Sequence, residues 1–170
     1  MDAIRILRQL RHLGGTASTK RFLGTARKEA NPEHLKRLEK LYAAAPISGL
    51  FNDHVIDFAA DGSTTVKFTP KKEHCHTMQS LHGSGYFKLL DDAAFFAAQA
   101  LDEENFIFTT SFNTYLVRAA AIGVPLISQG RVISAGKTLL IAESRLIEEE
   151  SGKLVATGSG TFQKSPHAVK

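Results

Sequence analysis

The apolar positions of the chain are spaced first as in helices and later as in strands. In residues 2–13 apolar side chains recur at every third position beside arginines, which is typical of a short basic amphipathic helix. Asn31, Pro32 and Glu33 then have the character of an N-cap, a first helical residue and a first-turn acid. These residues predict a helix over about residues 32–45, with one apolar stripe.

From residue 54 onward the apolar spacing changes to alternation. Residues 54–60 and 64–69 alternate apolar and polar side chains, and Asp61-Gly62 between them is a strong hairpin signal. After a polar loop, residues 83–101 are rich in Ala, Leu and Phe on all sides, which predicts a buried helix. Strand-like runs complete the chain at residues 106–117, 125–134, 138–148 and 154–162.

The order of these elements predicts an α+β protein. Strands joined by short turns pair antiparallel, and a helix that is apolar on nearly all sides needs cover on each of them. We therefore expect an antiparallel sheet wrapped around one long central helix, preceded by an N-terminal helical extension. Residues 1–31 would form this basic extension, and residues 32–165 would form the domain.

Composition agrees with one soluble globular domain and narrows the chemistry. Of the 170 residues, 43% are hydrophobic and 22% are charged, which is ordinary for a soluble protein. The single cysteine, Cys75, excludes a disulfide within one chain and a zinc site built from cysteines alone. No apolar run approaches the roughly 20 residues of a membrane span, and the charged N-terminus lacks the apolar core of a secretory signal. We therefore expect a cytoplasmic protein with no membrane span.

The positive charge is concentrated at the N-terminus. Residues 1–41 carry ten lysines and arginines against four acids, whereas residues 42–170 carry eleven against thirteen. A nucleic-acid-binding domain spreads basic residues over a whole face, so we expect no nucleic acid partner for the body of the chain. The basic segment has three interpretations: an arm that packs on the body or on a partner subunit, a mitochondrial presequence, or a DNA-reading appendage. We favour the arm; a presequence would make the location mitochondrial.

Candidate chemistry begins where a polar loop meets the apolar helix, at His82 and Gly83. The first-turn N–H groups of a helix have no intrahelical partner and lie at its positive dipole end. Because Gly83 has no side chain, a ligand oxygen can approach these groups closely. Such a site can stabilise an oxyanion that develops during a reaction. The alternative is that Gly83 and Gly85 only ease the turn into the helix.

Two adjacent carboxylates, Asp91 and Asp92, interrupt the apolar helix. An unpaired charge away from water costs several kcal/mol, so both residues need a reason to be there. We expect Asp92 to face solvent or a subunit boundary. Asp91 lies eight residues after Gly83, about 12 Å along a helix, so one substrate carbonyl cannot touch both within one chain. If the two act together they come from two chains, which predicts a homodimer or a dimer of dimers.

The residues around this helix form a pattern that extends along much of the chain. His76 is followed after five residues by His82-Gly83-Ser84, and Leu89-Leu90-Asp91 lies further on in the helix. Further residues of the same pattern follow at Tyr115, Gly123, residues 136–139 and residues 152–162. With this pattern the chain resembles, over about residues 35–163, the hotdog-fold acyl-CoA thioesterases of the phenylacetate-pathway (PaaI-like) type. In that family the pattern reads Asn, five residues, His-Gly-Gly, then Leu-x-Asp.

The resemblance implies a hotdog fold, hydrolysis of an acyl-CoA or acyl-carrier thioester, and no cofactor. Gly83 would donate its backbone N–H to the thioester oxygen, and Asp91 from the partner chain would act as nucleophile or as base for water. His82 would help to position the loop. Thr109 falls where many members carry a hydroxyl residue on the strand after the helix. Strand alternation groups Thr109 with Ser111 and Asn113, opposite Phe106, Phe108 and Phe112.

The chain departs from the family pattern at His76, which replaces Asn, and at Ser84, which replaces the second Gly. His76 can still hydrogen-bond an acyl carbonyl or a water, and imidazoles titrate near physiological pH, so His76 could share proton transfer with Asp91. The alternative function is a non-catalytic acyl-CoA-binding sensor or regulator on the same fold.

Four residues near the start of the helix, His74, Cys75, His76 and His82, have two other interpretations. One is a metal site, but they include no second ligand pair with a recognised zinc spacing. The other is a nucleophilic pair of Cys75 with a histidine, in which only local histidines would activate the thiol. We set both aside and expect neither a metal nor a cofactor.

Overall fold

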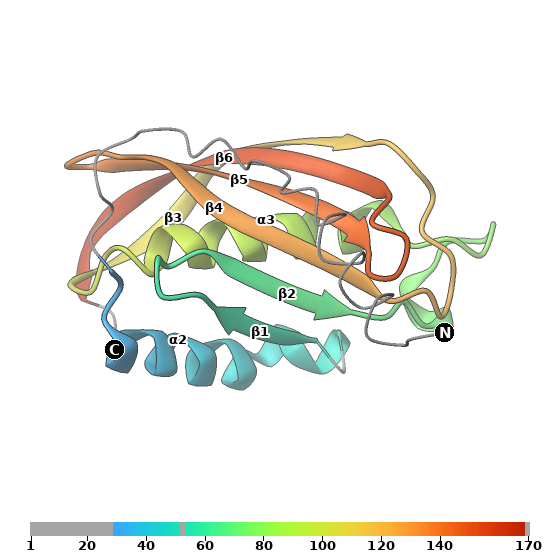
Figure 1. The fold of residues 1–170 in the computed structure, drawn as a ribbon, viewed down its shortest axis with the longest axis horizontal. Coiled ribbons are helices and arrows are strands. Elements are labelled where there is room, and N and C mark those ends of the chain that lie inside the picture. The colour runs from blue at the N-terminus through green and yellow to red at the C-terminus, as the bar shows by residue number, and fades with distance from the viewer. Residues whose placement is uncertain (1–28, 52–53, 169–170) are drawn as a thin grey trace, which may run out of the picture.

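The computed structural model describes residues 29–51 and 54–168, and in them the elements follow the predicted order (Figure 1). The elements are α2 (Pro32–Ala44), η2 (Pro46–Leu50), β1 (Val55–Phe58), β2 (Thr64–Phe68), η3 (Lys72–His74), α3 (Gly83–Gln99), β3 (Asn105–Leu116), β4 (Leu126–Ala135), β5 (Leu139–Glu148) and β6 (Leu154–Ala168). The helix predicted at residues 2–13, like most of the predicted extension, lies outside the described residues. In the described part of the chain, no helix is long and apolar enough to cross a membrane.

The six strands form one antiparallel sheet in the order β1-β2-β4-β5-β6-β3. The sheet curves around α3, and α2 runs along β1 (Figure 1). β3 follows α3 in the chain but pairs with β6, so it forms one outer edge of the sheet, while the short β1 forms the other. This arrangement confirms the prediction of an α+β protein whose antiparallel sheet wraps around a central helix.

Small residues let α3 approach the sheet closely. The four alanines of this helix are almost completely buried. At Ala93 the helix backbone meets β4, because a Cβ atom added at Gly130 would lie 1.9 Å from the Ala93 carbonyl oxygen. The Thr64 hydroxyl of β2 donates a hydrogen bond to the same oxygen over 2.5 Å. These contacts fix the height of α3 over the sheet, and with it the position of the two carboxylates that precede Ala93.

α2 begins as the sequence predicts and packs against α3. The Asn31 side chain accepts a hydrogen bond from the Glu33 N–H over 3.0 Å, and a proline takes the first helical position. Leu35 and Leu38 are buried in a cluster with residues from the C-terminal end of α3. This contact brings Tyr42, in the last turn of α2, beside the middle of α3.

A β-bulge in β3 changes the face on which one aromatic residue lies. The pairing of β3 with β6 is irregular between Thr109 and Ser111, which leaves one extra residue on β3. Beyond the bulge Phe112 packs in the core, with its ring centroid 6.4 Å from that of Phe162, whereas Phe108 before the bulge is 51% exposed. The prediction that Phe112 shares a face with Phe108, and Thr109 with Ser111 and Asn113, is therefore wrong, because the bulge reverses the alternation between Thr109 and Ser111.

Candidate active site

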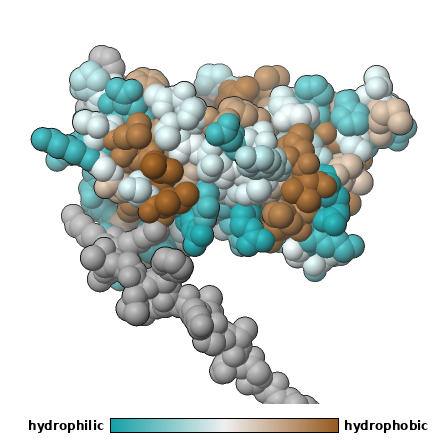
Figure 2. Space-filling model, turned by 90° about the horizontal axis from the view of Figure 1, so that it is seen from above, coloured by the Kyte–Doolittle hydropathy of each residue, from teal (hydrophilic) through white to brown (hydrophobic). Residues whose placement is uncertain are grey.

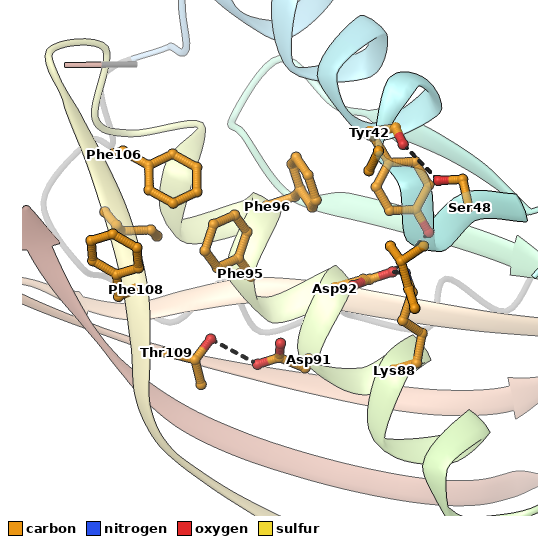
Figure 3. Close-up of a pocket in the computed structure, with 13 residues that line it drawn as sticks. Tyr42, Ser48, Lys88, Asp91, Asp92, Phe95, Phe96, Phe106, Phe108 and Thr109 are labelled. Carbon is orange, nitrogen blue, oxygen red and sulfur yellow. Dashed lines mark hydrogen bonds and ion pairs between the residues drawn. The ribbon is translucent and has the colours of Figure 1, made fainter. Parts of the chain in front are cut away.

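Asp91 lies in the middle of α3 and faces the first half of β3. The Thr109 hydroxyl donates a hydrogen bond to Asp91 Oδ1 over 3.1 Å (Figure 3). Burial raises the pKa of Asp91 to about 6; the Thr109 hydrogen bond and the Lys88 charge oppose this rise, and the neighbouring Asp92 charge adds to it. Asp91 is thus a carboxyl that titrates near neutral pH, as a general base or acid does.

A cavity of about 320 Å³ opens beside Asp91, between α3, the start of β3 and the end of α2. Four phenylalanines line its apolar side: Phe95, Phe96, Phe106 and Phe108. Its polar side is formed by Asp91, Asp92, Lys88, Thr109 and Tyr42. Figure 3 shows the aromatic rings gathered on one side and the Lys88–Asp92–Tyr42 group on the other, with Asp91 and Thr109 below the rings. An apolar cavity with a few convergent polar groups is the usual form of a small-molecule site.

Asp92 has partners of its own within the chain and does not face open solvent, which was one half of the expectation; the other half, a subunit boundary, stays a prediction. Its side chain is only 15% exposed and forms an ion pair with Lys88, one turn earlier on α3. The Tyr42 hydroxyl of α2 donates a hydrogen bond to Asp92 Oδ2 over 2.9 Å, and burial together with the Asp92 charge raises the pKa of Tyr42. The Lys88 ammonium also lies 5.2 Å from the centre of the Tyr42 ring. Asp92 therefore binds α2 to α3 within one chain.

The sequence interpretation missed Lys88 and Tyr42 as residues of this site. The four-residue spacing of Lys88 and Asp92 is a helical ion-pair signal that was available. Tyr42 gave no such signal, because it lies 50 residues from Asp92 in the chain.

The N-terminal end of α3 is capped by a histidine. His82 is the N-cap residue, and its Nδ1 accepts hydrogen bonds from the Ser84 N–H over 3.2 Å and from the Ser84 hydroxyl over 2.8 Å. Gly83 is the first helical residue and is exposed, and a Cβ atom added there would meet no heavy atom within 4 Å. The backbone at the start of α3 is therefore open to the approach of a ligand oxygen.

His76 lies in the loop before α3, exposed to solvent. Its backbone N–H donates to the Ser80 carbonyl over 3.0 Å, and its Nδ1 accepts from the Met78 N–H over 3.1 Å. His76, His82 and Gly83 do not line the cavity that contains Asp91. Two of the five predicted site residues, Asp91 and Thr109, thus lie together at the cavity within one chain. The other three, His76, His82 and Gly83, lie toward the N-terminal end of α3.

His74 and Cys75 have structural contacts. His74 is buried; its Nδ1 accepts from the Lys71 N–H over 3.0 Å, and its Nε2–H donates to the Leu50 carbonyl over 3.1 Å. The Cys75 thiol donates to the Lys71 carbonyl over 3.3 Å. Among the described residues, no group of three or more His, Cys, Asp and Glu side chains is placed to hold a metal ion.

The fold is similar to that of several solved structures. The PaaI protein of Escherichia coli, from the phenylacetic acid degradation operon, has a TM-score of 0.73 at 17% sequence identity, over 81% of this chain and 97% of that chain. Zebrafish thioesterase superfamily member 2 has a TM-score of 0.69 at 22% identity, over 76% and 96%. A Streptococcus mutans protein bound to acetyl-CoA has a TM-score of 0.62 at 16% identity, over 68% and 90%. At these identities the likeness is one of fold.

Comparison of the sequence with known protein families gives a second line of similarity, beside the fold. No curated protein sequence matches the chain. Residues 78–155 match the model of the thioesterase superfamily, and this segment includes His82, Gly83, Asp91 and Thr109. The match over residues 78–155 and the shared hotdog fold support the resemblance to thioesterases that the sequence shows.

Proposed function

We propose that this chain is an acyl-CoA thioester hydrolase. The observation that carries the proposal is the placement of Asp91, which lines the cavity beside α3, accepts a hydrogen bond from Thr109 and has a pKa of about 6. A carboxyl with this pKa is mostly ionised at neutral pH, yet it is a stronger base than a solvated aspartate. The phenylalanines of the cavity suit an apolar acyl group.

In the proposed reaction the two ends of the site come from two chains. Gly83 of one protomer donates its N–H to the thioester oxygen, where the N-terminal dipole of α3 stabilises the oxyanion. Asp91 of the other protomer takes a proton from water, whose oxygen attacks the thioester carbon. Breakdown of the tetrahedral intermediate cleaves the C–S bond, releases the carboxylic acid and returns the proton from Asp91 to the CoA sulfur. Direct attack by Asp91, with hydrolysis of the resulting anhydride, is the nucleophilic form of the same scheme.

Three further residues assist in this scheme. His82 caps the first turn of α3 and so holds Gly83 in place. Thr109 orients the Asp91 carboxylate through its hydroxyl. His76, exposed in the preceding loop, would hydrogen-bond the acyl carbonyl or a water and share in proton transfer.

A homodimer, alone or as a dimer of dimers, is part of the proposal. β3 is a twelve-residue strand at the outer edge of the sheet, and Phe108, Tyr115 and Leu116 on it are exposed. A long apolar edge strand is a site at which another chain can add its own strand. Figure 2 also shows two larger apolar patches, separated by a more polar band, on the face seen from above. Apolar surface of this kind is what a partner subunit covers.

The second candidate function is a non-catalytic acyl-CoA-binding sensor on the same fold. The observation that favours it is the pair of departures from the family pattern, His76 for Asn and Ser84 for Gly. Both lie toward the end of α3 at which the oxyanion would form, so both bear on turnover more than on binding. A sensor would bind an acyl-CoA without releasing its thiol.

Thiol release from a panel of short, long and aromatic acyl-CoAs tests the proposal. We expect turnover of at least one substrate, and a fall in kcat on the order of 10²- to 10⁴-fold in Asp91→Asn, which keeps the size of the side chain and removes its basicity. Asp57→Asn, at an exposed position of β1, is the matched control and should leave turnover unchanged. Binding without turnover across the panel would instead support the sensor, and a fully active Asp91→Asn would contradict the carboxylate mechanism.

A further inference from the structure

One wall of the cavity is polar and is not used by the proposed hydrolysis. It consists of Lys88 and Asp92 on α3 and the Tyr42 hydroxyl on α2, all of which line the cavity beside Asp91 (Figure 3). The side chains of Lys88 and Asp92 are each only 15% exposed. The pair helps to bind α2 to α3, but it does so within the wall of a largely apolar cavity, where desolvating two charges is costly.

The hydrogen-bonding capacity of this ion pair is only partly filled. Lys88 and Tyr42 both bind Asp92 Oδ2. Within the described residues Asp92 Oδ1 accepts no hydrogen bond and is not fully buried, and the Asp92 side chain lines the cavity. The Lys88 ammonium has three N–H groups; it donates to Asp92, and its other neighbours are the faces of the Tyr42 and Phe51 rings. Lys88 and Asp92 thus both line the cavity, and each retains capacity for a further hydrogen bond.

The charges of the pair cancel, which determines the kind of group that this wall can bind. A carboxylate on the ligand would add an unpaired negative charge beside Asp92. A hydroxyl group can donate to Asp92 Oδ1 and accept from Lys88 at the same time, and it adds no charge. An unsubstituted chain would cover both groups without replacing the water that hydrates them.

We propose that Lys88 and Asp92 form a polar subsite that recognises a hydroxyl group on the acyl chain. The inference rests on the proposed function, because it takes the cavity beside Asp91 as the acyl site. It makes a hydroxylated acyl thioester the preferred substrate class, with Lys88 and Asp92 as the specificity-determining residues. Tyr42 positions Asp92 by holding Oδ2, which leaves Oδ1 for the ligand.

Matched thioesters test the subsite. We compare kcat/KM for octanoyl-CoA with that for hydroxyoctanoyl-CoA isomers that carry the hydroxyl at successive carbons. The wild-type protein should prefer at least one isomer by about tenfold or more, because a site built to bind a hydroxyl rejects the analogue that lacks it. The double variant Lys88→Met/Asp92→Leu should lose this preference. It replaces both charged partners together and so leaves no unpaired charge, although the Tyr42 hydroxyl loses its acceptor.

A control and a second readout keep the outcomes separate. Lys67→Met, at a half-exposed lysine that pairs with Glu149 on the surface, should keep the preference. Calorimetric binding of S-octyl-CoA and S-hydroxyoctyl-CoA, thioethers that cannot be hydrolysed, measures the subsite without turnover. A hydroxyl preference in binding without hydrolysis of any thioester would overturn the proposed function and support the subsite. Hydrolysis with no preference for any isomer, or an equal loss for both substrate types in the double variant, would overturn the subsite.

Discussion

Asp91 and Asp92 are neighbours with the same side chain, yet they lie in different surroundings. They project about 100° apart around α3, so Asp91 reaches toward Thr109 on β3, whereas Asp92 reaches toward α2 (Figure 3). Asp92 is neutralised by Lys88 and accepts a hydrogen bond from Tyr42. Asp91 accepts its hydrogen bond from a neutral hydroxyl, and burial raises its pKa to about 6. Asp92 is thus held as a paired anion, whereas Asp91 stays a base near neutral pH.

The Thr109 hydroxyl should set the lower pH limit of activity. Its hydrogen bond favours the charged form of Asp91 and so lowers the pKa of that carboxyl. In Thr109→Val the pKa of Asp91 should rise above about 6. Because the ionised form is the base in the proposed reaction, the acid limb of the kcat/KM profile should move to higher pH. Thr110→Val is the control, since the Thr110 hydroxyl bonds the Thr161 carbonyl instead. An acid limb that stays in place in Thr109→Val would contradict the assignment.

The sequence predicts which residues form the candidate site better than it predicts the residues that these side chains contact. The motif around the helix singles out Asp91 and Thr109, and the structure places them in hydrogen-bond contact. The environment of Asp92 could not be predicted, because its neighbour Tyr42 lies in another helix and meets it only through the packing of α2 on α3. Contacts between distant segments leave no trace in local spacing.

At the scale of elements, the closeness of α3 to the sheet is the most sensitive feature of the fold. The helix touches β4 through its own backbone at Ala93 rather than through side chains, and this requires a residue without a Cβ atom at Gly130. The Thr64 hydroxyl also binds the Ala93 carbonyl, so β2 and β4 hold the helix at one point. A change at this point should move the carboxylates along with the helix.

Gly130→Ala should therefore destabilise the protein. The added Cβ would lie 1.9 Å from the Ala93 carbonyl oxygen, so α3 must shift away from β4. Overpacking of this kind costs about 1–3 kcal/mol or more in the free energy of unfolding, which urea denaturation measures. Gly49→Ala is the matched control, because a Cβ atom there meets no heavy atom within 4 Å. Equal stability of Gly130→Ala and wild type would show that the helix is not held this closely.

Most element boundaries follow from the sequence, although β6 runs to Ala168 and not to the predicted residue 162; the register of β3 does not follow from it. The predicted helix at residues 83–101 corresponds to Gly83–Gln99, and the predicted strand at 106–117 to Asn105–Leu116. The bulge in β3 falls within three successive hydroxyl residues, Thr109 to Ser111. Because all three are small and polar, either face suits each of them, and the alternation carries no signal of the extra residue.

At the scale of the whole molecule, α3 separates the two halves of the proposed site. Gly83 begins the helix and Asp91 lies eight residues further on, about 12 Å along the axis. The cavity that contains Asp91 is not lined by Gly83. In the proposed scheme each chain therefore contributes two half-sites, and the exposed edge of β3 offers a place for the second chain that would complete them.

Gly83→Pro should remove the oxyanion donor without breaking the helix. Proline is well tolerated at the first helical position and has no N–H. The preceding His82 has φ −67° and ψ 149°, the extended conformation that a following proline requires. We expect kcat to fall on the order of 10²- to 10³-fold, the usual loss for one oxyanion donor. Gly83→Ala keeps the N–H, and its Cβ would meet no heavy atom of the chain within 4 Å, so it should lose less activity than Gly83→Pro; equal rates for the two variants would exclude the N–H as donor.

Mixing two inactive variants should restore activity if the site is shared between chains. A protomer carrying Asp91→Asn still has its Gly83 N–H, and a protomer carrying Gly83→Pro still has its Asp91 carboxylate. A heterodimer of the two therefore contains one complete site and one that lacks both groups. With random exchange about half of the dimers are heterodimers, so about a quarter of the wild-type activity should return.

Co-expression of the two variants under different affinity tags, followed by purification through both tags, isolates this heterodimer for thiol-release assays. Its activity should then rise to about half of the wild-type value, because one of its two sites is complete. The matched control combines Asp91→Asn with Thr109→Val. Thr109 bonds the Asp91 of its own chain. In this control dimer the complete site therefore combines Gly83 of the Asp91→Asn protomer with Asp91 of the Thr109→Val protomer, where the hydrogen bond is missing. This site should show the pH profile of the Thr109→Val variant. A doubly tagged Asp91→Asn/Gly83→Pro dimer that stays inactive would show that Gly83 and Asp91 do not meet across the interface.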